Sequence, residues 1–208
     1  MSRRVAEYAV MMNQTAQSLY FWNRSIIYMN KIRVGTLTSQ PSKSENPFEH
    51  LNKVFYCFQH NLDNKKINVY FCNRNLQNMT LVADWDKYIL IAFHIIQNAV
   101  KYNSLMGSIV IILRVFIHEG INYLETEIID TGLGISKERQ ELLFKPFGEL
   151  SRTQTMKEVK DMSIGMGLSF SRAIASELGG IIEINVINET LTSLIFRIPV
   201  EVKQETKT

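Results

Sequence analysis

Hydrophobic residues recur at helical spacing through the first part of the chain and predict one long helix over residues 1–34. Steps of three and four make a narrow seam, typical of a coiled coil or bundle helix, although a helix packed on an ordinary core would also show a stripe. The pattern ends at Arg33, and Gly35 follows as a possible cap. The seam consists of Val5, Tyr8, Met12, Thr15, Leu19, Trp22, Ile26 and Met29.

The following polar segment, 38–47, is rich in Ser and Pro and predicts a flexible linker and domain boundary. Beyond this segment, the spacing of hydrophobic residues changes repeatedly between the period of helices and that of strands. Asn46 and Pro47 form a typical helix start. Helices are predicted over 47–62, 84–102, 136–143 and 167–178, and strands over 67–71, 81–83, 108–116, 123–130, 181–187 and 193–199.

These elements predict an α+β fold, a two-layer α/β sandwich with helices on one face of a mixed sheet, preceded by the long helix. Residues 148–164 lack a pattern, and loops of that length are commonly functional. We divide the chain into a helical segment 1–37, the linker, a domain over 48–200 and a polar tail over 201–208 that we expect to be frayed.

Composition narrows the possible functions. The 208 residues are 46% hydrophobic and 21% charged, which suits one globular domain with an appendage. A net charge of +3 without a dense basic run argues against nucleic acid as a partner. Cys57 and Cys72 lack metal-site spacing and predict free thiols in a reducing compartment. No signal peptide or membrane-spanning segment is evident, so we expect a cytoplasmic location, with a membrane anchor left open for a longer parent protein.

Candidate chemistry begins on the helix predicted over 84–102. At 100° per residue, Lys87, His94, Asn98 and Lys101 share one arc, which we expect to be exposed and to line a cavity. An amide oxygen at Asn98 suits Mg²⁺, which takes few protein ligands, and Lys101 would neutralise phosphate. A solvated amide and a solvated lysine are the alternatives. The opposite side, expected to pack on the sheet, carries Trp85, Ile89, Ala92, Ile96 and Ala99.

Two glycine-rich turns follow. Asp130 ends a strand ahead of Gly132 and Gly134, where a buried carboxylate would accept a hydrogen bond from the amino group of adenine. A simple tight turn is the alternative. Gly165 and Gly167 precede a helix whose free N–H groups and positive dipole end suit phosphate.

Four segments in this order resemble the N, G1, F and G2 boxes of sensor histidine kinases, whose superfamily also includes gyrase-type, Hsp90-type and MutL-type ATPases. The segments are QNAVKYN, DTGLGIS, LFKPF and GMGLSFSRAIASELGG, starting at Gln97, Asp130, Leu143 and Gly165. The resemblance covers Phe48 to Val200. It implies a Bergerat-type ATP-binding fold with ATP and Mg²⁺ as cofactors.

The resemblance also implies roles for single residues. Asn98 resembles the asparagine that coordinates Mg²⁺, Lys101 the lysine that contacts phosphate, and Tyr102 the aromatic residue lying against adenine. Phe144 and Phe147 resemble the F box under the ATP lid, although plain hydrophobic anchoring explains them equally well. Where the family usually has Gly and Thr before the last box, this chain has Ser163 and Ile164. The implied nucleotide-binding set is Asn98, Tyr102, Asp130, Gly132, Gly134, Phe144, Phe147, Gly165, Gly167 and Leu168.

His94 departs from many histidine kinases, which have asparagine there; chemotaxis-type kinases have histidine and gyrase-like ATPases glutamate. A histidine could act as a general base or polarise the attacking group, because its ordinary pKa is near neutrality. The alternative is a partly buried histidine satisfied by a hydrogen bond.

Residues 29–37, MNKIRVGTL, resemble the end of the second dimerisation helix of these kinases. The motif around the phospho-accepting histidine is missing, since His50, His60 and His118 lack its neighbours. We therefore expect the chain to begin after the acceptor and to dimerise through its N-terminal helix. The γ-phosphoryl group would pass to a histidine on another segment and then to a response-regulator receiver domain. Alternatives are a non-catalytic ATP-binding dimerisation module, and an ATPase in which His94 activates water.

Overall fold

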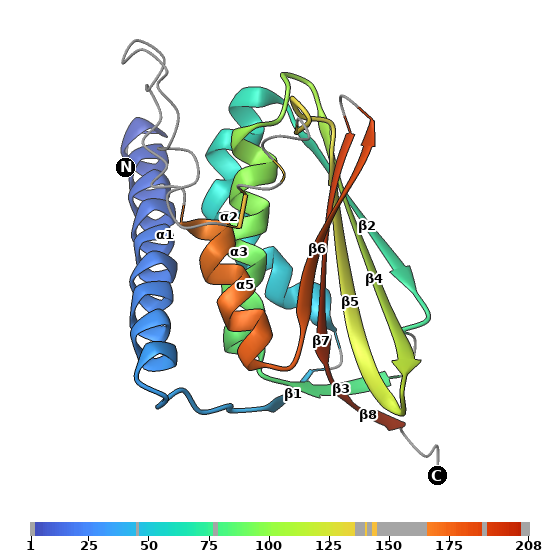
Figure 1. Ribbon diagram of the computed structural model, residues 1–208. Coiled ribbons are helices and arrows are strands. Elements are labelled where there is room, and N and C mark those ends of the chain that lie inside the picture. The colour runs from blue at the N-terminus through green and yellow to red at the C-terminus, as the bar shows by residue number, and fades with distance from the viewer. Residues whose placement is uncertain are drawn as a thin grey trace.

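A five-stranded sheet with helices packed on one face forms the body of the protein (Figure 1). This computed structural model describes residues 3–44, 46–76, 79–135, 140, 143–144, 166–188 and 191–204. The strand order is β2-β4-β5-β7-β6, in which β2 and β4 are parallel and the other pairs antiparallel. The strands are β2 (Asn68–Arg74), β4 (Ser108–His118), β5 (Ile121–Asp130), β6 (Ile181–Asn188) and β7 (Leu191–Pro199).

Three helices cover one face of this sheet: α2 (Pro47–Lys65), α3 (Trp85–Lys101) and α5 (Gly167–Glu177). The predicted α/β sandwich is therefore confirmed. The predicted start at Asn46 also holds, because Asn46 accepts a hydrogen bond from the Phe48 N–H. The cap of α3 is Asp84, which accepts a hydrogen bond from the Lys87 N–H. The helix predicted over 136–143 falls largely outside the described residues.

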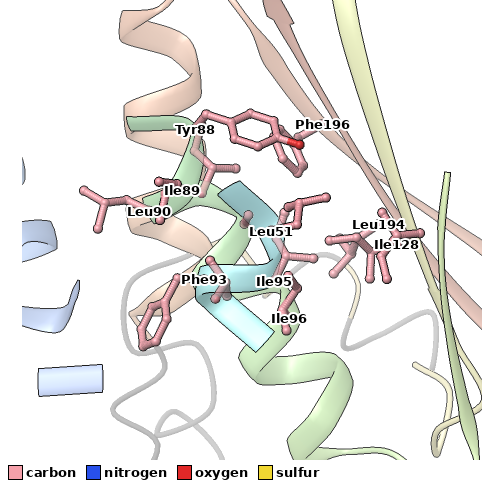
Figure 2. Packing of buried hydrophobic residues seen from close by; sticks show 14 of the residues in the cluster. Leu51, Tyr88, Ile89, Leu90, Phe93, Ile95, Ile96, Ile128, Leu194 and Phe196 are labelled. Atoms are coloured by element: carbon pink, nitrogen blue, oxygen red, sulfur yellow. The ribbon is translucent and has the colours of Figure 1, made fainter. Parts of the chain in front are cut away.

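The core lies between α3 and the sheet. Alternate residues of β4, such as Ile109, Ile111 and Leu113, point into it and are fully buried. Figure 2 shows Tyr88 of α3 beside Phe196 of β7, and the Tyr88 hydroxyl also lies 3.0 Å from the Thr126 hydroxyl. Burying one aliphatic side chain such as Ile109 contributes about 1.5–3 kcal/mol to the stability of the fold. The apolar side of α3 predicted from the sequence is buried as expected.

The long helix α1 (Arg3–Arg33) adds a partial third layer on the outer side of the helices (Figure 1). Its predicted end is confirmed by Gly35, which has a φ of +67°. The apolar seam is mostly uncovered: Val5, Tyr8, Met12, Leu19 and Ile26 are exposed. A second stripe faces the domain instead and includes Gln14, Phe21, Ser25, Tyr28 and Ile32.

A small separate sheet joins the two ends of the domain. Its order is β1 (Ser42–Ser44), β3 (Met79–Ala83) and β8 (Glu201–Gln204), all antiparallel. Two expectations are therefore wrong. Part of the segment expected to be a flexible linker is a strand, and the tail expected to be frayed is paired as far as Gln204. The reason is that β1 and β8 pair with the two edges of β3 through backbone hydrogen bonds, which do not require hydrophobic side chains.

Candidate functional site

Asp130 ends β5 at the edge of the helical layer, and its side chain is largely buried. One carboxylate oxygen, Oδ1, accepts a hydrogen bond from the Gly132 N–H at 3.0 Å. Desolvation by burial raises the pKa of Asp130 to about 6, and the Gly132 N–H offsets only part of this shift. A carboxylate in this environment is stabilised by any further donor that reaches it, so the residue favours a ligand with an N–H group.

Position 132 requires glycine because the backbone of Tyr102 and the side chain of Asp130 lie too close to it for a Cβ atom. A Cβ atom there would lie 2.5 Å from Asp130 Oδ1 and 2.7 Å from the Tyr102 carbonyl oxygen. The following residue, Leu133, donates its N–H to that same carbonyl at 3.2 Å. These contacts attach the loop after β5 directly to the C-terminal end of α3. Gly134 has a φ of +65°, which also favours glycine.

A hydrogen-bonded clamp holds this corner and was not anticipated from the sequence. The Thr131 hydroxyl accepts the Ser108 N–H at 2.8 Å, and the Thr131 N–H donates to the Ser108 carbonyl at 3.1 Å. The Asn103 amide also donates to the Ser108 carbonyl, at 3.1 Å. Gly107 has no room for a Cβ beside Asn103. The clamp orients Asp130 and Tyr102 relative to one another.

Three residues predicted to bind nucleotide lie at the C-terminal end of α3 beside this clamp. Asn98, Lys101 and Tyr102 are all half-buried, and the Lys101 ammonium lies 4.9 Å from the centre of the Tyr102 ring. Lys65 of α2 caps the same helix end. Its ammonium donates to the carbonyls of Val100 at 3.1 Å, Lys101 at 2.6 Å and Asn103 at 3.2 Å. A cation at a helix C-terminus stabilises it, and sequence reasoning missed this one.

The first turn of α5 begins at Gly167. Met166 at the N-cap makes no side-chain capping bond, and the first turn contains no acidic residue. Its N–H groups and dipole therefore suit an anion. Leu168, in this turn, is buried. The guanidinium carbon of Arg172 lies 5.2 Å from the centre of the Phe144 ring. Phe147, Ser163, Ile164 and Gly165, together with the predicted lid, lie outside the described residues.

The expectation of one exposed polar stripe along α3 is wrong for its upstream half. Lys87 is buried, pairs with Asp84 and donates to the Thr38 carbonyl at 2.7 Å. His94 is 0% exposed, and its Nε2 lies 2.8 Å from the Ser25 hydroxyl of α1. Burial lowers the pKa of His94 to about 3. The cause is α1, the third layer, which covers this half and leaves Asn98 and Lys101 at the rim.

In the part of the chain that the structure describes, the cysteines and acidic side chains form no metal site. Among the described residues, no group of three or more His, Cys, Asp or Glu side chains could hold a metal ion. Cys57 and Cys72 are free thiols, and burial raises the pKa of Cys57 to about 11. Asn98 is suited to a cation that takes most of its ligands from phosphate and water, as Mg²⁺ does.

The layered fold and this corner together define a nucleotide-binding domain of the α/β sandwich class. A family model described as "Histidine kinase-, DNA gyrase B-, and HSP90-like ATPase" matches residues 83–202, more than half of the chain. The chain belongs to this family. The matched segment runs from the end of β3 into β8 and so contains Asn98, Asp130 and Gly167.

Curated relatives include several histidine kinases. The sensor histidine kinase YclK of Bacillus subtilis is 33% identical over 127 residues, which are 59% of this chain and 24% of that protein. The adaptive-response sensory kinase SasA of Synechococcus is 31% identical over 121 residues, 58% of this chain and 30% of that protein. The chain thus spans less than a third of the length of these relatives.

Solved structures share the fold at lower identity. Histidine kinase AdeS of Acinetobacter baumannii has a TM-score of 0.66 at 20% identity, covering 88% of this chain and 79% of that one. Full-length ShkA in complex with AMPPNP has a TM-score of 0.71 at 14% identity, covering 98% of this chain and 40% of that one. Within the described residues, no helix is both long and apolar enough to cross a membrane.

Proposed function

We propose that this chain is the ATP-binding catalytic region of a two-component histidine kinase, which transfers the γ-phosphoryl group of ATP to a histidine outside this chain. The observation that carries the proposal is the corner where Asp130, a desolvated carboxylate, is held against the last turn of α3 through Gly132. Family membership and the kinases among the relatives support the same conclusion.

In this proposal Asp130 selects adenine. Its carboxylate accepts a hydrogen bond from the exocyclic amino group, and the ring of Tyr102 lies against the base. Guanine presents a carbonyl oxygen at that position. Two buried acceptors facing one another cost a few kcal/mol, so guanine nucleotides are rejected.

The phosphates would lie between the last turn of α3 and the first turn of α5. The amide oxygen of Asn98 would be the protein ligand of Mg²⁺, and Lys101 would neutralise phosphate charge. The N–H groups at Gly167 and Leu168 would bind phosphate oxygens, and Gly165 and Gly134 would permit close approach. Phe144 and Phe147 would support the lid. Catalysis would then depend on positioning and electrostatics, and His94 is a candidate only if it becomes accessible.

We further propose that α1 forms a homodimer and meets the acceptor segment through its uncovered seam. Val5, Tyr8, Met12, Leu19 and Ile26 are exposed apolar residues at heptad spacing, and such a stripe favours a partner helix. A receiver domain would take the phosphoryl group next; one solved neighbour is the kinase ThkA in complex with its response regulator TrrA. Free thiols and the relatives' signalling role favour a cytoplasmic location.

The decisive experiment incubates the chain with γ-labelled ATP and Mg²⁺, with and without an added hairpin that carries an acceptor histidine. Acid-labile label on the hairpin is the expected result. Release of free phosphate alone would identify an ATPase, and ATP binding with neither product would identify a binding module. A hairpin whose acceptor histidine is replaced by glutamine is the control.

A further inference from the structure

Thr131 lies between the two residues that build the candidate adenine site, Asp130 and Gly132. Asp130 Oδ1 accepts a hydrogen bond from the Gly132 N–H at 3.0 Å, which closes an Asx turn with Thr131 at its centre. The backbone conformation of Thr131 therefore sets the direction of the Asp130 carboxylate. Such a short turn keeps one geometry only when contacts outside the turn hold its central residue.

Those contacts come from strand β4. The Thr131 N–H donates to the Ser108 carbonyl at 3.1 Å, and the Ser108 N–H donates to Thr131 Oγ1 at 2.8 Å. Ser108 is the first residue of β4, and the next residue, Ile109, pairs with Asp130 in the sheet. The Asp130 carboxylate is thus attached to β4 twice, through its own strand pairing and through the residue that follows it.

The donors and acceptors around Thr131 fix the direction of each hydrogen bond. The Ser108 carbonyl can only accept, so the side-chain NH₂ group of Asn103 faces it, at 3.1 Å. Asn103 Oδ1 then faces Thr131 Oγ1 at 3.2 Å and accepts its proton. Residue 131 must therefore accept one hydrogen bond and donate another through the same atom. A hydroxyl does both, whereas the side chain of valine, which has the same shape, does neither.

This ring of hydrogen bonds is tightly packed. A Cβ atom on Gly107 would overlap Asn103 Oδ1 and lie 2.7 Å from Thr131 Oγ1. The backbone of Asn103 also forms a β-bridge with Gly132, the residue whose N–H binds the Asp130 carboxylate. The ring is therefore a rigid support for the turn, and it holds the end of α3 against that turn.

We propose that Thr131 is a positioning residue that determines specificity for the amino group of adenine. Its hydroxyl fixes the Asx turn, and the turn directs the Asp130 carboxylate toward the donor on the base. Thr131 acts through Asp130 and does not have to contact the nucleotide. This inference rests on the proposed function, in which Asp130 accepts a hydrogen bond from that amino group. It assigns part of the base discrimination to a hydroxyl whose partners are Ser108 and Asn103.

The test compares ADP with purine riboside diphosphate, the same nucleotide without the exocyclic amino group. Calorimetry on the whole chain with Mg²⁺ gives both affinities, and their ratio measures what the amino group contributes. Thr131→Val should lower the affinity for ADP about three- to tenfold, the equivalent of one neutral hydrogen bond, and leave that for the analogue nearly unchanged. Thr131→Ser keeps the hydroxyl and should restore the ratio.

A matched control separates positioning from the loss of a buried hydroxyl. Thr126→Val removes a hydroxyl from the same strand, where its partner is the Tyr88 hydroxyl at 3.0 Å in the core, and should leave the ratio unchanged. In an Asp130→Asn background, Thr131→Val should not lower the ratio further. Asn103→Ala opens the same ring from its other side and should lower the ratio too, which keeps the test decisive if Thr131→Val does not fold.

Three outcomes would overturn this inference alone. One is an equal loss of affinity for ADP and the analogue in Thr131→Val, which is what a merely structural role predicts. The second is a ratio that Thr131→Ser does not restore, and the third is a ratio that falls equally in Thr126→Val. Failure of the unmodified chain to bind ADP would overturn the proposed function as well.

Discussion

The two halves of the polar arc on α3 have opposite environments. Lys87 and His94 are buried beneath α1 and the segment after it, where Lys87 Nζ and His94 Nε2 have hydrogen-bond partners within the protein. Asn98 and Lys101, one and two turns further on, lie half-buried at the rim beside Asp130. The same residue pattern therefore produces a structural contact in one half and a candidate ligand site in the other. The difference teaches that helical periodicity defines a face and that neighbouring layers decide its use.

The largest effect is expected from Asp130→Asn. The substitution presents an amide where adenine needs a full acceptor, and AMPPNP affinity should fall at least about a hundredfold, or roughly 2.7 kcal/mol. Calorimetry measures this, with Asp63→Asn on the exposed surface of α2 as the matched control. Retained affinity would show that Asp130 does not contact adenine. The half of the arc beside Asp130 would then lack the ligand site that distinguishes it from the buried half.

Replacing a glycine beside each half of the arc by alanine compares how rigid the surroundings of the two halves are. Gly132→Ala places a Cβ against the Tyr102 carbonyl, which is backbone and cannot move away, and should destabilise the fold by about 2–3 kcal/mol. Gly167→Ala meets only the edge of the His94 ring at 3.1 Å and should cost about 1 kcal/mol. Urea unfolding gives both values. Equal losses would show that the two halves are equally constrained.

The acid dependence of stability should differ between the two halves. The lowered pKa of His94, about 3, makes its contribution fall as the pH drops below 6.5 toward 3. The raised pKa of Asp130, about 6, has the opposite sign, because its contribution is greatest below pH 3.8 and is lost as the pH rises to 6. Between about pH 4 and 6 the two slopes, each about 1.4 kcal/mol per pH unit, oppose one another.

Asp130→Asn should remove the pH dependence that Asp130 contributes. Relative to the unmodified chain, the variant should be about 1–3 kcal/mol more stable at pH 7, and this advantage should vanish below pH 4. Urea unfolding at a series of pH values measures the difference, in which the other carboxylates cancel. A difference that does not change with pH would mean that the pKa of Asp130 is not raised in the fold.

The smallest effect is expected from Lys65→Met. The substitution removes three charged hydrogen bonds to the end of α3 but keeps the apolar stem, and should cost about 1 kcal/mol of stability. Nucleotide affinity should fall slightly, since Asn98 and Tyr102 lie on that turn. Lys53→Met, on the exposed face of α2, is the control. A loss no larger than in the control would show that the helix end is stable without its cap.

Much of the fold could be predicted because local rules and long-range packing agree. Asn46 and Pro47 start a helix as expected, and the alternating residues of β4 define its buried face. At the site, Asp130 and Gly132 were identified by a turn whose chemistry is local. Lys65 could not be found in this way, because it reaches the end of α3 from another helix, and its own surroundings in the sequence resemble those of any exposed lysine.

The sequence alone determined the helices α1, α2, α3 and α5, the strands of the five-stranded sheet and the order of the four family segments. It also determined the residues that approach one another through short loops. Only the tertiary structure decided which side of α1 packs on the domain, since its two stripes share one helical period and differ only in what covers them. It likewise decided that the polar residues after α1 pair with β3, and that His94 is buried. Periodicity along a chain records which residues share a face, whereas burial depends on elements distant in sequence.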